Sequence, residues 1–175
     1  MRRSPELERS AVVGVSQLMA VAARTAPKTR GIDNIEIIVI DDAASVEKLT
    51  KKMKELAKSN SRPSMERDAN AIAGSPAVVI IGVKSNPAGL NCGFCGYTTC
   101  DELKKGPGVC SYNSIDLGIS ISSAVSVAGK LHVDNRVMYS IGKAALALEL
   151  LSKDVKQALG LPLSVTGKNP FFDRK

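Results

Sequence analysis

The sequence predicts an α+β fold in which helices pack on a sheet. Stretches with helical hydrophobic spacing alternate with short, β-rich apolar runs, which indicates layered α/β or α+β architecture. With 175 residues, of which 44% are hydrophobic, the chain is long enough to bury a core of its own. All four cysteines fall within positions 92 to 110, so one short segment differs in composition from the rest of the chain.

The chain begins in the order helix, strand, helix. Residues 6–25 carry apolar side chains at helical spacing, and Pro27 is expected to end this helix because the residue before a proline disfavours helical geometry. Residues 34–40 form a short, mostly apolar run that predicts a buried strand. Residues 43–58 return to helical spacing, with apolar residues on one face and lysines on the other.

A loop, a second strand and an unusual segment follow. Residues 59–75 are polar and contain Ser, Asn, Pro and Gly, which favours a loop with room for a short helix. Residues 77–83 read AVVIIGV and are apolar on both faces, as expected of a central strand. Residues 85–113 are Gly-rich, are short of large aliphatic side chains and hold every cysteine. They predict an insertion wrapped around its own ligand.

The last third of the chain adds two helices and a strand. Residues 114–131 combine apolar and small side chains over a length too great for a typical strand, so they predict a helix. Asp134 and Asn135 predict a turn, residues 136–151 predict another helix, and residues 157–164 predict a last strand.

Charge and composition exclude some classes of function. The net charge is +7, from 24 basic and 17 acidic residues, but the charges are interspersed rather than clustered. Aromatic residues make up 3% and Trp is absent, which argues against a nucleic-acid module that stacks bases on aromatic side chains. No apolar run approaches the roughly 18 residues that span a bilayer. We therefore expect a cytoplasmic protein with neither a membrane span nor a nucleic-acid partner.

The cysteines divide the chain and carry its strongest chemical signal. We predict one α+β domain over residues 1–84 and 114–175, interrupted by the inserted loop 85–113. The cysteine spacing is C-x2-C-x4-C-x9-C, and clustered thiols in a reducing cytosol indicate a metal site rather than disulfides. The candidate ligands are Cys92, Cys95, Cys100 and Cys110.

An iron–sulfur cluster is the favoured interpretation of this spacing. A structural zinc site usually contains two C-x2-C pairs, whereas three close cysteines and a later fourth suit the corners of a [4Fe–4S] cube. Gly93 and Gly96 permit the positive φ angles that turn backbone N–H groups toward sulfur. Structural zinc, free thiols, and a cluster that only staples the loop stay open as alternatives.

The segment GLNCGFCGYTTC resembles the four-cysteine iron–sulfur domain of corrinoid iron–sulfur proteins and of ferredoxin-like subunits of membrane electron-transport complexes. Their motif begins N-C-G-x-C-G-x-x-x-C, as the chain does from Asn91 to Cys100. The resemblance departs at the fourth cysteine, which those families place further along the chain. Here only nine residues separate Cys100 from Cys110.

Nearly the whole chain resembles the DUF2148 family of ferredoxin domain-containing proteins. The segments that carry this resemblance include LMAVAARTAPKTRGIDNIEIIVID, GLNCGFCGYTTC and GLPLSVTGKNPFFDR. At the level of the fold, that family is similar to FMN-dependent nitroreductases, in which a helix likewise ends in Ala-Pro, as at Ala26 and Pro27 here. The resemblance implies a nitroreductase-like, homodimeric α+β fold with an antiparallel-rich sheet.

A flavin is the second cofactor that the resemblance suggests. Nitroreductases hold the FMN phosphate with basic side chains, and Arg24, Lys28 and Arg30 occupy a comparable place here. The alternative is that basic residues at a helix C-terminus complement the helix dipole without any ligand. Lys143, on an apolar helix, either extends to solvent or reaches an anion.

The sequence therefore supports three hypotheses about function. In the first, a [4Fe–4S] cluster passes single electrons, to or from a flavin or a partner oxidoreductase. In the second, a metal or cluster only shapes the loop of a non-redox binding module. In the third, the protein is an FMN-dependent oxidoreductase of the nitroreductase kind. The sequence leaves open whether the protein is itself an enzyme, and no catalytic residue is assigned.

Overall fold

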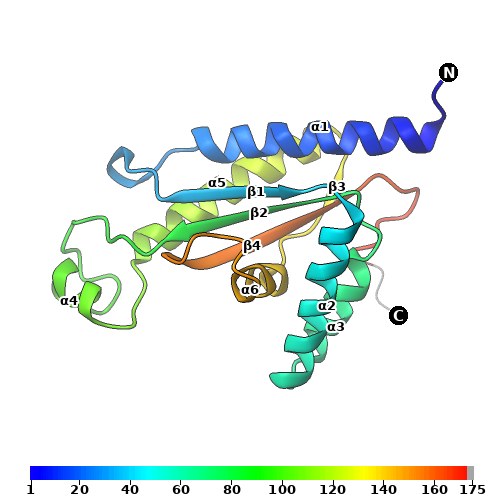
Figure 1. Ribbon diagram of the computed structural model, residues 1–175. Helices are drawn as coiled ribbons and strands as arrows, with labels where there is room; N and C mark the ends of the chain where they lie inside the picture. The colour runs from blue at the N-terminus through cyan, green and yellow to red at the C-terminus, as the bar shows by residue number, and fades with distance from the viewer. Residues whose placement is uncertain (173–175) are drawn as a thin grey trace.

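The fold is built on a four-stranded antiparallel sheet. The computed structural model describes residues 1–172, and Figure 1 shows the sheet between two layers of helices. The strands lie in the order β1-β2-β4-β3, and every neighbouring pair is antiparallel. Their bounds are Ile35–Ile40 for β1, Ala77–Lys84 for β2, Asp134–Asn135 for β3 and Val155–Ser164 for β4. The predicted α+β class and antiparallel-rich sheet are confirmed.

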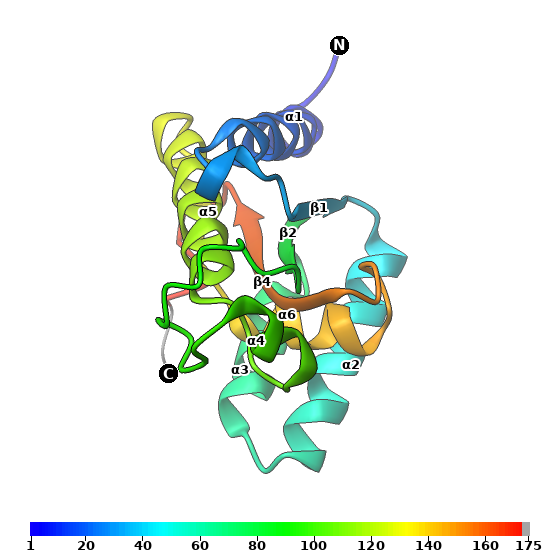
Figure 2. The same ribbon diagram turned by 90° about the vertical axis from the view of Figure 1, so that its left-hand side faces the viewer.

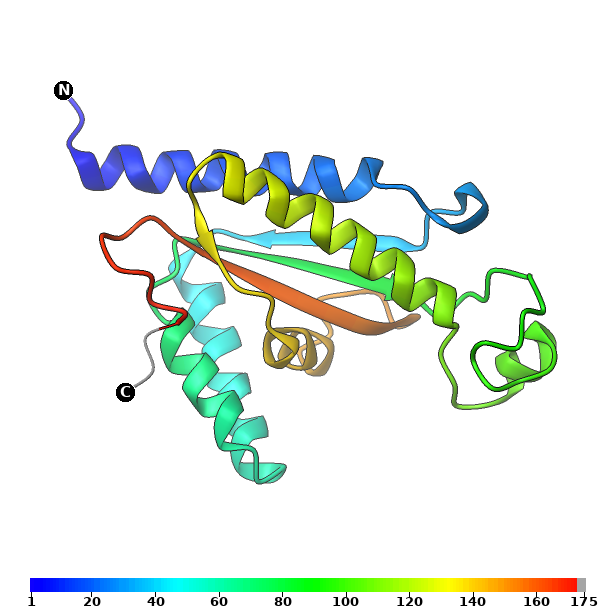
Figure 3. The ribbon, with the colours of Figure 1, turned by 180° about the vertical axis from the view of Figure 1, so that it is seen from behind.

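Five helices cover the two faces of this sheet. On one face lie α1 (Ser4–Thr25) and α5 (Ser111–Lys130), and Figure 3, seen from this face, shows α5 crossing in front of the strands. On the other face lie α2 (Ala43–Ser59), α3 (Pro63–Ile72) and α6 (Tyr139–Ala147). In the described part of the chain, no helix has both the length and the apolar character needed to cross a bilayer.

Strand β2 holds the two helical layers together. Val79, Ile81 and their alternating neighbours pack against α1 and α5, whereas Val78 and Ile80 pack against α2, α3 and α6. All seven residues from Ala77 to Val83 are buried. This confirms the prediction of a central strand that is apolar on both faces, because each face of β2 meets its own layer of helices.

The segment 59–75, expected mostly as a loop, contains the ten-residue helix α3. Pro63 starts this helix, as proline does well at a first helical position. Met65, Ala69 and Ile72 form its buried stripe, whose helical spacing among polar residues is too short to stand out in the sequence.

The turn predicted at Asp134 and Asn135 is wrong, because these residues form the short strand β3 against the end of β4. Met138 then bridges to Gly160 through two backbone hydrogen bonds of 2.8 and 3.0 Å. This pairing keeps the chain extended up to Met138, so α6 begins later than the predicted helix over 136–151. The paired residues of β4 lie 28 and 30 positions away in the sequence, so local patterns do not reveal the pairing.

Helix α6 approaches β4 unusually closely at Gly142. A Cβ atom at this position would lie 1.7 Å from the backbone oxygen of Ala158. Across the same contact, a Cβ at Gly160 would lie 2.1 Å from the side chain of Ile141. Gly142 therefore lets the backbone of α6 contact that of β4 directly, and Gly160 leaves room for the Ile141 side chain.

We predict that Gly142→Ala destabilises the protein by about 3 kcal/mol, because the clashing atoms belong to the backbone of a central strand pair and cannot rotate away. Urea denaturation measures this free energy of unfolding. The matched control is Gly14→Ala in α1, where a Cβ would have no neighbour within 4 Å. That change should stabilise the protein by about 0.5–1 kcal/mol through helix propensity. Equal unfolding midpoints for the two variants would contradict the prediction.

Candidate metal centre

The cysteine-bearing segment 85–113 lies beyond the end of the sheet, next to the connection between α1 and β1. Figure 2 views the molecule from this end. The segment contains the short helix α4 (Cys100–Lys105) and a small core of its own, in which Leu103 and Cys110 are buried together with Ala88. The predicted loop is thus more ordered than expected, because Cys100 begins a short helix.

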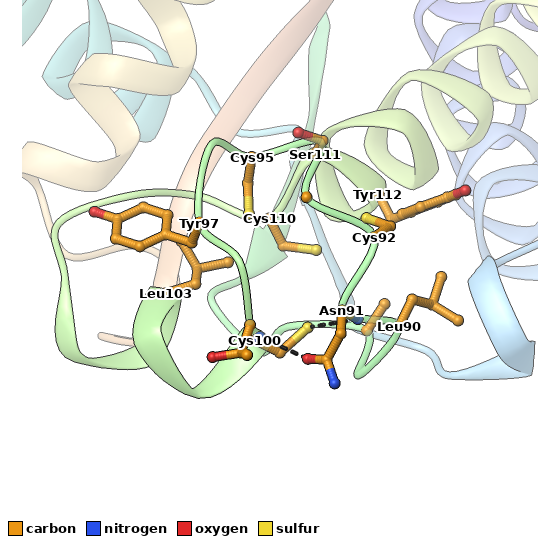
Figure 4. A pocket seen from close by; sticks show the side chains of 13 residues that line it. Leu90, Asn91, Cys92, Cys95, Tyr97, Cys100, Leu103, Cys110, Ser111 and Tyr112 are labelled. Atoms are coloured by element: carbon orange, nitrogen blue, oxygen red, sulfur yellow. Dashed lines mark hydrogen bonds between the residues drawn. The ribbon is translucent and has the colours of Figure 1, made fainter.

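All four cysteines line one small pocket in this segment. Figure 4 shows their side chains entering it from different sides. Cys92 and Cys95 lie in the irregular chain before α4, Cys100 is the first residue of α4, and Cys110 directly precedes α5. None of them forms a disulfide bond. Four cysteines separated by up to 18 positions thus line the same pocket.

Asn91 ties the start of this loop to Cys100. Its side-chain oxygen accepts a hydrogen bond from the Cys100 backbone N–H at 2.8 Å, and its own backbone N–H points at the Cys100 sulfur at 3.4 Å. Asn91 has φ 49°, and Gly93 and Gly96 have φ 76° and 85°, all in the left-handed region that Gly and Asn tolerate. The Asn and the two Gly of the motif therefore have conformational reasons for their positions.

A capping box fixes the orientation of Cys100. The Thr99 hydroxyl accepts a hydrogen bond from the Glu102 backbone N–H at 3.2 Å, and the Glu102 carboxylate accepts from the Thr99 N–H at 3.3 Å. This arrangement starts α4 at Cys100. The pattern T-x-x-E is present in the sequence at Thr99 to Glu102, and this signal could have predicted the start of α4.

Polar side chains fasten the segment to the sheet and to the connection between α1 and β1. The Asn113 amide donates hydrogen bonds to the backbone oxygens of Lys84 and Asn86 at 3.0 and 2.9 Å. The Arg30 guanidinium donates one to the oxygen of Ala88 at 3.0 Å. Sequence reasoning missed Asn113, which is almost fully buried, because an Asn in a polar segment carries no distinctive signal.

The donor set fits a thiolate-bound metal group. Four cysteine sulfurs face one pocket, and one of them already receives a backbone N–H, which is the kind of contact that stabilises cluster sulfurs. Among residues 1–172, no three His, Cys, Asp or Glu side chains lie in the arrangement that would hold a single metal ion.

The basic residues considered for a flavin phosphate gather at the end of α1, and each has partners within the protein. Arg24 donates hydrogen bonds to Asp33 at 2.5 Å and to the backbone oxygen of Ile35 at 2.7 Å. Lys28 donates to the oxygens of Ala23 and Ala26 at 2.9 and 2.8 Å, so it caps the helix. A phosphate site at these residues stays a prediction.

Two pKa shifts follow from these contacts. Burial lowers the pKa of Lys28, more than the nearby Asp33 carboxylate raises it. Burial opposes ionisation of Asp33, but the hydrogen bonds from Arg24 and from the Ile35 N–H outweigh it and hold the pKa below its usual value.

The adjacent 3-10 helix η1 (Thr29–Gly31) is anchored to α5, because Thr29 donates to the buried Asp116 through its backbone N–H and its hydroxyl.

Comparison with known proteins identifies the family. A family model described as an uncharacterized protein containing a ferredoxin domain, DUF2148, matches residues 105–174. An uncharacterized protein of Archaeoglobus fulgidus is 42% identical over 167 residues, covering 90% of this chain and 88% of the relative. The chain belongs to this family. The matched region of the family model includes Cys110 but not the three earlier cysteines.

Solved structures confirm the nitroreductase-like fold. A nitroreductase with bound FMN from Desulfitobacterium hafniense superposes with a TM-score of 0.62 at 15% identity, over 89% of this chain and 78% of that one. A nitroreductase with bound FMN from Bacteroides fragilis gives a TM-score of 0.62 at 12% identity, over 93% and 81%. At such low identity the likeness concerns the fold alone.

Proposed function

We propose that the protein is an iron–sulfur redox protein in which Cys92, Cys95, Cys100 and Cys110 hold a [4Fe–4S] cluster. The observation that carries this proposal is that all four cysteines line one pocket. Membership in a family described by its ferredoxin domain supports it. A bound cluster would supply one-electron chemistry, and the rest of the chain would position and insulate it.

The surroundings of the pocket suit electron exchange with a partner protein. Cys110 is buried at the base of the pocket, whereas Cys92 is exposed at its rim. Beside the rim, Phe94 is 69% exposed and stacks on Tyr112, with ring centroids 5.9 Å apart. An exposed aromatic residue is a common anchor for a partner protein, so a redox partner would approach the cluster from this side.

The domain division and the compartment are parts of the same proposal. We propose that residues 85–113 are an insertion into an α+β domain formed by residues 1–84 and 114–175, since this segment has its own small core. We place the protein in the cytoplasm, because four unpaired cysteines suit a reducing compartment. A zinc site or a purely structural cluster is the competing interpretation.

We predict about four iron and four sulfide per chain after anaerobic purification, because four thiolates are the usual ligand set of a [4Fe–4S] cluster. Cys92→Ser and Cys110→Ser should each lose most of the iron. Ser122→Ala, on the exposed side of α5, should retain it. Metal analysis and the absorption band near about 400 nm provide the measurement. Stoichiometric zinc without sulfide in protein never exposed to air would refute the cluster.

We also propose a homodimer, supported by exposed apolar side chains on the adjacent helices α1 and α5. Leu18 and Val21 project from α1, and Ile115 and Ile119 project from α5. Helix α6 adds little to this surface, because most of its apolar residues are buried against β4 and α2. Unpartnered apolar surface of this kind often marks an interface.

Light scattering at micromolar concentration should therefore give the mass of two chains. Val21→Glu, which introduces a charge on the exposed side of α1, should shift the protein to monomers without unfolding it. Lys51→Glu on α2 is the control for the change in charge. A monomer mass for the wild-type protein would rule out the dimer.

A flavin-dependent oxidoreductase is the second candidate function. The fold matches those of nitroreductases whose structures contain FMN. Under this proposal Arg24, Lys28 and Arg30 bind the FMN phosphate. The three residues lie at the same end of the molecule as the cysteine loop, since Arg30 is hydrogen-bonded to Ala88. A flavin held there would lie near the cluster.

If this candidate is correct, FMN fluorescence should be quenched on titration with the protein. Arg24→Ala should weaken binding by about 1.5–3 kcal/mol, the contribution of a charge-assisted hydrogen bond. Arg9→Ala, on the same helix, is the matched control. If Arg24 only pairs with Asp33, FMN will not bind at roughly a hundred micromolar, and Arg24→Ala will lower the stability of the protein by no more than about 1 kcal/mol.

A further inference from the structure

A groove lies between α5, α6 and the first half of β4, and none of the candidate flavin residues lines it. Its cavity of about 350 Å³ adjoins a second cavity of about 500 Å³ that extends toward α2 and α3. The two cavities share Tyr139 and Lys143, so they meet at these two side chains, and we refer to them together as the groove. These volumes are in the range of small-molecule binding sites.

The groove exists because the sheet is incomplete on this side. Strand β3 pairs only with Leu163 and Ser164, and Met138 bridges only to Gly160. Residues 155–159 of β4 therefore have β2 on one side and no strand on the other among the described elements. The space that a longer β3 would fill is open between the two helices.

The groove is cationic. Lys143 and Lys156 line the first cavity, Arg62 lines the second, and neither lining includes an Asp or Glu. Within residues 1–172, none of the ion pairs involves Lys143 or Lys156. Two lysines without acidic partners in a concave site favour an anionic ligand.

Tyr139 adds a polar group at the point where the cavities meet. It is the first residue of α6, and Lys143 follows one helical turn later on the same side of the helix. The neighbouring Ser64 and Arg62 side chains lower the pKa of the Tyr139 hydroxyl. A hydroxyl and an ammonium group one turn apart can both donate to one anionic head group.

The remaining walls are apolar. Leu117 and Gly118 come from α5, Leu146 comes from α6, and Ala158 and Leu159 come from β4. A ligand that fills the groove therefore needs an apolar body as well as an anionic head. Apolar walls supplied by two helices and a strand suit a flat apolar body such as an aromatic ring.

The groove also begins close to the cysteine site. Ser114 lines it and donates a hydrogen bond to Gln157 at 2.7 Å, which closes this end. Ser114 follows Cys110 by four residues, and four residues of helix rise by about 6 Å. A molecule in the groove would thus lie within a few side chains of the candidate metal centre.

We infer that this groove binds a small organic anion, with a carboxylate or phosphate head at Tyr139 and Lys143 and a flat apolar body between α5 and β4. Lys156 contributes further positive charge. The inferred anion site adds to the proposed function the chemical class of the molecule held beside the metal centre. Only the redox role of that ligand rests on the proposed function. Binding itself does not require the cluster.

The test uses the fluorescent aromatic sulfonate 8-anilinonaphthalene-1-sulfonate as the probe, on the full-length protein. We expect saturable binding that weakens with salt, because part of the attraction is electrostatic. Lys143→Gln should raise the dissociation constant by about three- to tenfold, between the effects of an exposed ion pair and a buried charged hydrogen bond. Lys130→Gln, at the exposed end of α5, is the control and should bind as the wild type does.

Competition identifies the source of the anionic group. Displacement of the probe by FMN would assign the groove to a flavin phosphate. Displacement by 2-naphthoate but not by FMN would assign it to an aromatic carboxylate. If neither compound displaces the probe, or if Lys143→Gln and Lys130→Gln bind it equally, the inference is wrong.

A second variant tests the place of binding. A Cβ at Gly118 would have no neighbour within 4 Å, so Gly118→Leu should fill the groove without disturbing the fold. Circular dichroism and the melting temperature check folding, and probe binding should be lost. Unchanged binding by this folded variant would place the probe elsewhere. Iron is measured in every sample, so that binding by iron-free protein would support the groove even if the proposed cluster fails.

Discussion

The structure depends on the complete burial of strand β2 between two layers of helices. Every residue from Ala77 to Val83 is excluded from solvent, and β1 and β4 flank the strand on its two edges. Alternate side chains supply the cores of both layers, so neither α1 and α5 nor α2, α3 and α6 could pack without it. A substitution in β2 would therefore affect both cores at once.

The cysteine segment takes its position from this strand. It leaves the sheet at Lys84, the last residue of β2, and returns to the core at α5, which packs on the same strand. Asn113 bonds back to Lys84, and Arg30 holds Ala88 from the α1 side. A small segment with few aliphatic residues is thus held at both ends by polar contacts to a rigid frame. Such anchoring lets four thiols separated in sequence keep a common pocket.

The two candidate cofactor regions differ in how far their polar groups are already satisfied. Arg24 and Lys28 bond to Asp33 and to carbonyl oxygens at the end of α1, so a phosphate there would compete with existing partners. In the groove beside α6, Lys143 and Lys156 belong to no ion pair of the described chain. An anion that enters the groove would be attracted to both lysines without having to displace a protein carboxylate.

The sequence by itself determined the main helices, the central strand, the α+β class and the identity of the candidate thiol ligands. These features depend on local patterns: hydrophobic period, proline positions and the spacing of cysteines. Only the tertiary structure decided the strand β3, the close contact at Gly142 and the anchoring role of Asn113. The same holds for the groove around Tyr139 and Lys143. Each of these joins residues that are far apart in the chain, and a pattern read along one segment contains no information about which distant backbone it will meet.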